Sequence, residues 1–98
     1  MKMTRAGLDQ IKNKILPVLK EAGVTHSALF GSYVRGEETD DSDIDLLVEV
    51  PEDTGLFAYI ALKRKLEQAL SKKVDLVTYK SLHPLLRDKI LREQDPIL

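Results

Sequence analysis

The sequence predicts an α/β fold, because stretches with helical and strand patterns alternate along it. Apolar residues recur every three or four positions in three stretches and form short apolar runs in three others. In order, we expect a helix, a strand, a helical turn, a strand, a helix, a strand and a helix. The 98 residues, 43% of them hydrophobic, suffice for one small core, so we expect a single domain over residues 1–98.

The first two expected elements lead to a glycine–serine pair. A helix is expected at residues 8–22, where Pro17 should kink or divide it and Gly23 should end it. The next apolar run, at residues 24–30, is expected to be a strand that ends directly before Gly31.

The middle of the chain contains the clearest strand. It follows a helical turn expected at residues 32–35 and a polar loop at residues 37–42. In this strand, at residues 43–50, alternate side chains point to opposite faces. One face carries the apolar Ile44, Leu46, Val48 and Val50, and the other carries Asp43, Asp45, Leu47 and Glu49.

The second half is expected to add a helix, a strand and a final helix. The first helix, at residues 56–70, has Tyr59, Leu62, Leu66, Ala69 and Leu70 as its inner stripe. A strand is expected at residues 74–79, and Ser81 is placed to cap a last helix at residues 82–93. The tail, residues 95–98, is expected to fray or to dock on a partner.

Four apolar residues near the C-terminus have two interpretations. Leu85, Leu86, Ile97 and Leu98 could form an apolar contact patch for a partner. For Leu85 and Leu86, packing in the core is the simpler explanation.

The composition excludes several classes of function. Lys and Arg total 15 against 16 Asp and Glu, so there is no basic excess and we expect no direct binding of nucleic acid. The absence of cysteine excludes disulfides, thiolate catalysis and zinc–thiolate sites. No apolar run has transmembrane length and the start lacks a signal-peptide pattern, so we expect no membrane association and a cytoplasmic location.

Two acids, Asp43 and Asp45, interrupt the clearest strand. Residues two apart in a strand project from the same face, about 7 Å apart, where two unpaired carboxylates repel each other. A divalent cation such as Mg²⁺, which prefers oxygen ligands, removes that repulsion. The pair therefore indicates a metal site beside a triphosphate, and the alternative is two solvated acids on an exposed face.

Gly31 and Ser32 strengthen the phosphate interpretation. A glycine at the end of a strand lets the backbone approach a phosphate closely, and the following helical turn presents free N–H groups. The Ser32 hydroxyl can donate a hydrogen bond to a β- or γ-phosphate oxygen. Alternatively this is an ordinary turn with Ser32 as the N-cap, and both roles can hold together.

Asp75 is the third candidate acid, set between the apolar Val74 and Leu76. If its strand neighbours that of Asp43 and Asp45, three carboxylates converge. Two metal ions about 3.5–4 Å apart can then activate an attacking hydroxyl and stabilise a pyrophosphate leaving group. Asp75 would ligate the metal on the nucleophile's side or accept the hydroxyl proton, and the alternative is an acid at the edge of a strand.

Three ordered segments resemble the signatures of the minimal nucleotidyltransferase (MNT) family, which is part of the DNA polymerase β-like superfamily. They are residues 29–36 (LFGSYVRG), residues 42–48 (SDIDLLV), and Leu66-Glu67 followed by residues 73–77 (KVDLV). The resemblance implies a nucleotidyltransferase fold: a short mixed β-sheet with helices packed mainly on one face.

The resemblance also implies the site. Mg²⁺, with two ions expected, and ATP as nucleotide donor would be bound with Asp43, Asp45 and Asp75 as metal ligands and catalytic acids. Gly31 and Ser32 would lie at the phosphates. Arg35 belongs to the first signature and lies on the same side of its turn as Ser32. It would pair with an acid of the site, contact phosphate or form a structural ion pair.

The family further implies a partner protein. Its members are often paired with a HEPN-domain toxin, commonly an RNase, and act as the antitoxin by transferring AMP from ATP to a tyrosine of the toxin. We therefore expect a Mg²⁺-dependent adenylyltransferase that modifies a HEPN partner. The alternatives are an antitoxin that binds nucleotide and masks its partner without catalysis, and a stand-alone nucleotide or metal sensor.

Overall fold

The chain forms a four-stranded mixed sheet with helices, which confirms the predicted fold class. In the computed structural model, which describes residues 4–98, the strands lie in the order β3-β2-β1-β4. Strand β1 is antiparallel to β2 and β4, whereas β2 and β3 are parallel. The elements are α1 (Arg5–Glu21), β1 (His26–Phe30), α2 (Ser32–Arg35), β2 (Ile44–Glu49), α3 (Leu56–Leu70), β3 (Val74–Thr78), a 3₁₀ turn (Tyr79–Ser81), α4 (Pro84–Glu93) and β4 (Asp95–Pro96).

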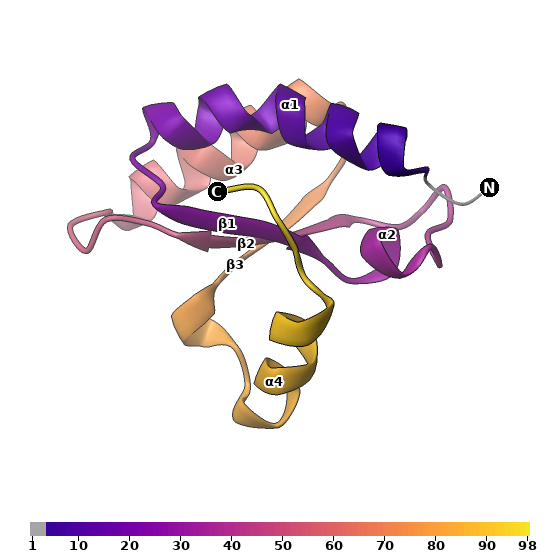
Figure 1. The fold of residues 1–98 in the computed structure, drawn as a ribbon. Coiled ribbons are helices and arrows are strands. Elements are labelled where there is room, and N and C mark those ends of the chain that lie inside the picture. Colours follow the sequence, from indigo (N-terminus) through magenta and orange to yellow (C-terminus); the bar gives the residue numbers. More distant parts are fainter. Residues whose placement is uncertain (1–3) are drawn as a thin grey trace.

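Helices α1 and α3 lie together over one face of the sheet, and α4 lies on the other side (Figure 1). The core fills the space between α1, α3 and the sheet because each of these elements turns an apolar face inward. Its buried members are Leu8, Ile11, Ile15, Leu19, Val24, Leu29, Tyr33, Ile44, Leu46, Val48, Leu62, Leu66 and Val74.

Strand β2 alternates as predicted. Ile44, Leu46 and Val48 belong to the core under α1 and α3, whereas Asp45 and Leu47 point to the other face. The predicted strand was one residue too long at each end. Asp43 lies just before β2, because pairing begins where the amide of Ile44 donates to the carbonyl of Lys73 (3.0 Å).

Helix α1 is longer than predicted and is not divided. It begins at Arg5, where Thr4 is the N-cap and its Oγ1 accepts a hydrogen bond from the Gly7 amide (3.0 Å). Pro17 lies inside the continuous helix. The expected division is wrong because apolar residues on both sides of Pro17 pack into the same core, which outweighs the loss of one helical hydrogen bond.

Strand β1 begins two residues later than predicted, at His26. The amide of Val24 instead donates to the carbonyl of Leu19 (3.0 Å), which closes the end of α1. Gly23 takes a positive φ of 78°, so the predicted helix stop is confirmed.

The last helix starts later than predicted, and its cap is a different residue. Ser81 lies in the 3₁₀ turn, where its hydroxyl contacts that of Thr78 (2.6 Å). The N-cap of α4 is His83, whose Nδ1 accepts a hydrogen bond from the Leu85 amide (3.1 Å), and Pro84 occupies the first helical position. The prediction for Ser81 was therefore wrong.

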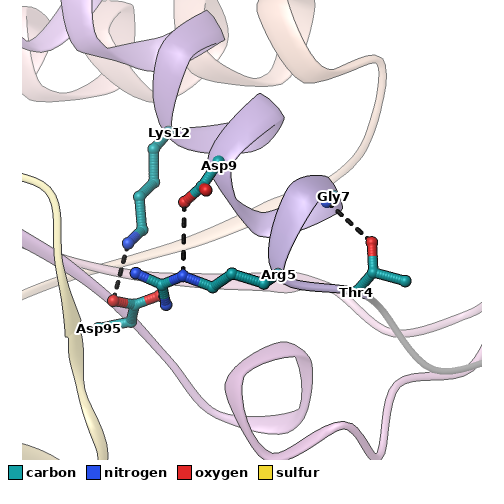
Figure 2. A network of polar contacts seen from close by, with 6 residues as sticks. All are labelled: Thr4, Arg5, Gly7, Asp9, Lys12 and Asp95. Atoms are coloured by element: carbon teal, nitrogen blue, oxygen red, sulfur yellow. Dashed lines mark hydrogen bonds and ion pairs between the residues drawn. The ribbon is translucent and has the colours of Figure 1, made fainter.

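The C-terminal tail does not fray, so that alternative of the prediction was wrong. Residues Asp95–Pro96 form β4 beside β1. The Asp95 carboxylate contacts Lys12 Nζ (2.7 Å) and Arg5 Nη1 (2.9 Å), which ties β4 to α1 (Figure 2). Ile97 and Leu98 then pack against the core. Within residues 4–98, no helix has the length and hydrophobicity needed to span a bilayer.

Candidate active site

Parallel pairing of β2 and β3 sets Asp45 beside Asp75. The two residues are direct partners in the register, so their side chains leave the same face of the sheet. Asp75 is exposed and Asp45 is partly buried. Burial first, and then the charge of Asp75 and a hydrogen bond with it, raise the pKa of Asp45 to about 6. The charge of Asp43 adds to this rise, so all three predicted acids lie within electrostatic reach of one another.

Gly31 lies against Asp45. Its backbone has φ 78° and ψ −153°, a region that is essentially restricted to glycine. A Cβ atom at this position would lie 1.9 Å from Asp45 Oδ2 and 2.8 Å from Asp45 Cγ. The strand register explains this approach, because Phe30, the residue before Gly31, is the direct partner of Asp45. The glycine turn and the acids therefore form one site.

Ser32 is the first residue of α2 and not its N-cap. The N-cap is Gly31, and no side chain caps this short helix. The alternative role of Ser32 as an N-cap is therefore wrong, because its backbone is already helical. The carbonyl of Ser32 accepts a hydrogen bond from the Glu37 amide (2.9 Å), and Gly36 ends α2 in a left-handed conformation.

Arg35 makes two ion pairs close to the acids. Its Nε lies 3.2 Å from Glu37 Oε2, and its Nη1 lies 3.6 Å from Glu93 Oε2 in α4. The positive charge of Arg35 also acts to lower the pKa of Asp45, although burial and Asp75 outweigh it. A structural ion pair, one of the three alternatives for Arg35, is thus present, and it joins α2 to α4.

Side chains outside the predicted site set the positions of Asp43 and Asp75. Glu67 Oε2 accepts a hydrogen bond from the Val74 amide (3.0 Å), which anchors β3 one residue before Asp75. The loop before Asp43 is closed by Ser42, whose Oγ accepts from the Thr39 amide (2.9 Å). Sequence reasoning assigned no role to Glu67, although it lies in a recognised signature. It also missed Glu93, because the ion pair of Glu93 with Arg35 depends on the position of α4 in the fold.

A cavity of about 250 Å³ opens at Asp45. Its walls come from the end of β1, from the α2 turn and from α4. The lining residues are Phe30, Gly31, Arg35, Asp45, Leu86, Lys89, Ile90 and Glu93. Two larger cavities, of about 340 and 360 Å³, are lined in part by Tyr79 and by none of the three acids. The smaller cavity is therefore the candidate site, because Asp45, Gly31 and Arg35 line it.

The acids fit a divalent cation, but they do not form a complete cage for it. Within residues 4–98, no three acidic or histidine side chains are grouped closely enough to hold a metal alone. Burial, and after it the charge of Asp75, raises the pKa of Asp45, and a cation between the two carboxylates would favour their ionised forms. Mg²⁺ commonly binds through one or two carboxylates, with phosphate oxygens and water completing its coordination.

Comparison with known proteins identifies the family of this chain. The model of the family "Nucleotidyltransferase domain" matches residues 12–94. The "Putative protein adenylyltransferase MJ0435" of Methanocaldococcus jannaschii is 47% identical over 93% of this chain and 98% of its own length. The "Protein adenylyltransferase MntA" of Thermococcus cleftensis is 39% identical over 93% of this chain and 96% of its own length.

Solved structures share the fold. A crystal structure of a toxin–antitoxin with AMP-PNP matches with a TM-score of 0.75 and 30% identity, over 89% of this chain and 72% of that one. A structure of the tri-AMPylated Shewanella oneidensis HEPN toxin in complex with MNT antitoxin matches with a TM-score of 0.70 and 27% identity, over 92% and 71% of the two chains. The chain belongs to the nucleotidyltransferase domain family and is a minimal nucleotidyltransferase.

Proposed function

We propose that this chain transfers AMP from ATP, with Mg²⁺, to a tyrosine hydroxyl of a HEPN-type RNase toxin and thereby acts as its antitoxin. One observation carries the proposal: Asp45 lies opposite Asp75 and against Gly31, so the candidate metal and phosphate sites adjoin. Relatives named as protein adenylyltransferases support the reaction. The related complex of an AMPylated HEPN toxin with an MNT antitoxin supports the partner.

In this proposal, Asp43, Asp45 and Asp75 hold two Mg²⁺ ions. Bound Mg²⁺ neutralises the triphosphate and stabilises the charge that develops on the attacking and leaving oxygens. The raised pKa of Asp45 supports its assignment as a ligand, since an acid that is costly to ionise alone gains most from a cation. Glu67 is a positioning residue, because it holds the start of β3 and therefore Asp75.

Gly31 and Ser32 hold the phosphates in this proposal. Gly31 has no side chain, so its backbone can lie against both Asp45 and a phosphate oxygen. Ser32 donates its hydroxyl to a β- or γ-phosphate oxygen. Arg35, held at the cavity by Glu37 and Glu93, is placed to contact the phosphates with its guanidinium.

The transfer is a single displacement. The tyrosine oxygen attacks the α-phosphorus of ATP, and the bond from that phosphorus to the oxygen bridging the α- and β-phosphates breaks. The electron pair leaves with pyrophosphate, and AMP remains on the tyrosine. We assign the hydroxyl proton to Asp75, because it is exposed and can pass the proton on to water.

The decisive experiment incubates the chain with Mg²⁺, α-labelled ATP and the product of the adjacent gene, which this proposal takes to be the HEPN protein. A parallel reaction uses the Asp43→Asn/Asp45→Asn variant, and γ-labelled ATP controls for transfer of phosphate. We expect label on the HEPN protein only with α-labelled ATP and the unaltered chain. Peptide mass spectrometry then identifies the modified residue, which we expect to be a tyrosine.

Two results would count against the proposal. Full labelling by the double variant would show that the acids do not carry the reaction. Inhibition of the toxin without ATP, by the unaltered chain and the double variant alike, would instead indicate an antitoxin that masks its partner.

A further inference from the structure

Helix α4 presents an apolar face that the rest of the described chain leaves uncovered. The helix lies on the side of the sheet away from α1 and α3 (Figure 1), and none of its residues is buried. Leu85 is 85% exposed and Leu86 is 54% exposed. Their assignment to the core was therefore wrong, and the alternative of an apolar contact patch stands. A ten-residue helix has little stability by itself and gains from packing against a neighbour.

The exposed face of α4 continues into the cavity at Asp45. Leu86, Lys89 and Ile90 of α4 line the same cavity as Asp45. Leu85 is outside the cavity lining, but it lies one turn before Lys89 on the same side of α4. A protein that inserted a hydroxyl side chain beside Asp45 would therefore cover Leu85 with the surface around that side chain.

The charges on α4 indicate what kind of surface fits it. Arg87, Lys89 and Arg92 outnumber Asp88 on this helix, and within residues 4–98 these three cations form no ion pair. The remaining acid of α4, Glu93, is engaged by Arg35. Asp88 also forms no ion pair among the described residues, so the exposed leucines lie on a helix with a net excess of unpaired positive charge. This excess favours a partner with acidic residues around an apolar contact.

Exposure by itself does not single out α4. Leu56 and Phe57, at the start of α3, are 70% and 88% exposed. They belong to the helical layer on the other side of the sheet, and neither lines the cavity at Asp45 (Figure 1). Continuity with the cavity distinguishes the α4 face.

We propose that the α4 face, defined by Leu85, Leu86 and Lys89, is the docking surface for the protein that carries the acceptor hydroxyl. The partner contributes an apolar contact bordered by acidic residues. The proposal rests on the proposed function, in that it takes the acceptor to be a protein modified at Asp45 and Asp75.

The test compares Leu85→Asp with the matched control Phe57→Asp. Both changes place a carboxylate at a position that is at least 85% exposed, so both variants should fold. The rate of AMP transfer to the HEPN acceptor of the proposed function is measured against the concentration of that acceptor. We expect Leu85→Asp to raise the KM for the acceptor about tenfold, the loss typical of a central interface residue. Its kcat and its affinity for ATP should not change, and Phe57→Asp should match the unaltered chain.

A third variant tests the charge of the partner surface. Leu85→Lys removes the same apolar contact but adds a positive charge. If the partner surface is acidic, the KM for the acceptor should rise less with Leu85→Lys than with Leu85→Asp. An equal or larger rise with Leu85→Lys would overturn the acidic border.

Each remaining outcome has a definite meaning. An unchanged KM with Leu85→Asp, while the unaltered chain labels the acceptor, would overturn the docking surface alone. An equal loss with Phe57→Asp would also overturn it, because the effect would not be specific to α4. A homodimer that Leu85→Asp dissociates without changing the KM would show that a second copy covers α4. If the unaltered chain labels no acceptor, the proposed function and the docking surface fail together.

Discussion

Replacing Gly31 with alanine should damage both the fold and the site. The added methyl group would lie 1.9 Å from Asp45 Oδ2, far inside van der Waals contact. The backbone at φ 78° and ψ −153° is also unfavourable for any residue with a Cβ. The change therefore imposes backbone strain and forces the Asp45 carboxylate to move.

The magnitude follows from these two contributions. Backbone strain of this kind costs about 1–3 kcal/mol, and forcing a group into filled space costs about 1–3 kcal/mol. Because the Asp45 side chain can rotate away in part, we expect Gly31→Ala to lower the free energy of unfolding by about 2–4 kcal/mol. A displacement of about 1 Å at a catalytic group reduces the rate roughly 100-fold, so AMP transfer should fall at least that far.

The matched control is Gly23→Ala. Gly23 has the same φ of 78°, but a Cβ there would meet Pro51 Cγ at 3.2 Å, away from the acids. Urea unfolding measures stability, and transfer from α-labelled ATP, assayed well below the unfolding transition, measures activity. We expect both variants to lose stability and only Gly31→Ala to lose activity.

Two results would refute this reasoning. Gly31→Ala with unchanged stability and transfer would show that Gly31 does not lie against Asp45. An equal loss of activity in Gly23→Ala would show that the effect follows from general destabilisation and not from the site.

Three further changes test single contacts. In metal-free protein, raising the pH from 4 to 7 should lower stability, because the folded state keeps a proton on Asp45 up to about pH 6 while the unfolded chain has lost it. Asp45→Asn should therefore raise the free energy of unfolding by about 1 kcal/mol at pH 7.5, a value reduced for the partial exposure of this side chain, and change it little at pH 4. Urea unfolding in EDTA at both pH values measures this difference, and a loss of stability at pH 7.5 would contradict the reasoning. Asp95→Ala removes the contacts to Lys12 and Arg5 and should lower the free energy of unfolding by about 1–2 kcal/mol. Hydrogen exchange should become faster at Ile97, whose amide bonds to β1. Unchanged exchange would mean that the ion pairs do not hold β4. Glu67→Ala leaves the Val74 amide without its hydrogen-bond acceptor, so it should lower the free energy of unfolding by about 1–2 kcal/mol and slow AMP transfer. Unchanged transfer would exclude a positioning role for Glu67.

Several features of the site could be predicted because they depend on short-range patterns. The alternation of Ile44, Leu46 and Val48 identified β2 and its core face, and these residues lie where expected. The acids Asp43, Asp45 and Asp75 stood out because acids are poor strand residues in or beside apolar runs. The glycine at position 31 was singled out for a close backbone approach, and its positive φ agrees with that expectation.

Other features depended on tertiary contacts. Ser81 as the cap of the last helix, a division of α1 at Pro17 and a frayed tail were wrong, because packing and long-range hydrogen bonds override local propensity. Leu85 and Leu86 have the spacing of core residues, yet α4 lies where they are exposed.

The sequence by itself therefore determined the order of the elements and the candidate residues of the site, since both are expressed in spacings of a few residues. Only the tertiary structure decided that β3 pairs with β2 in the register that opposes Asp45 and Asp75. It also decided that α4 lines the cavity at Asp45 while Leu85 and Leu86 stay exposed. The physical reason is that strand register and helix placement are chosen by the summed burial and hydrogen bonding of residues far apart in the chain, which no local pattern contains.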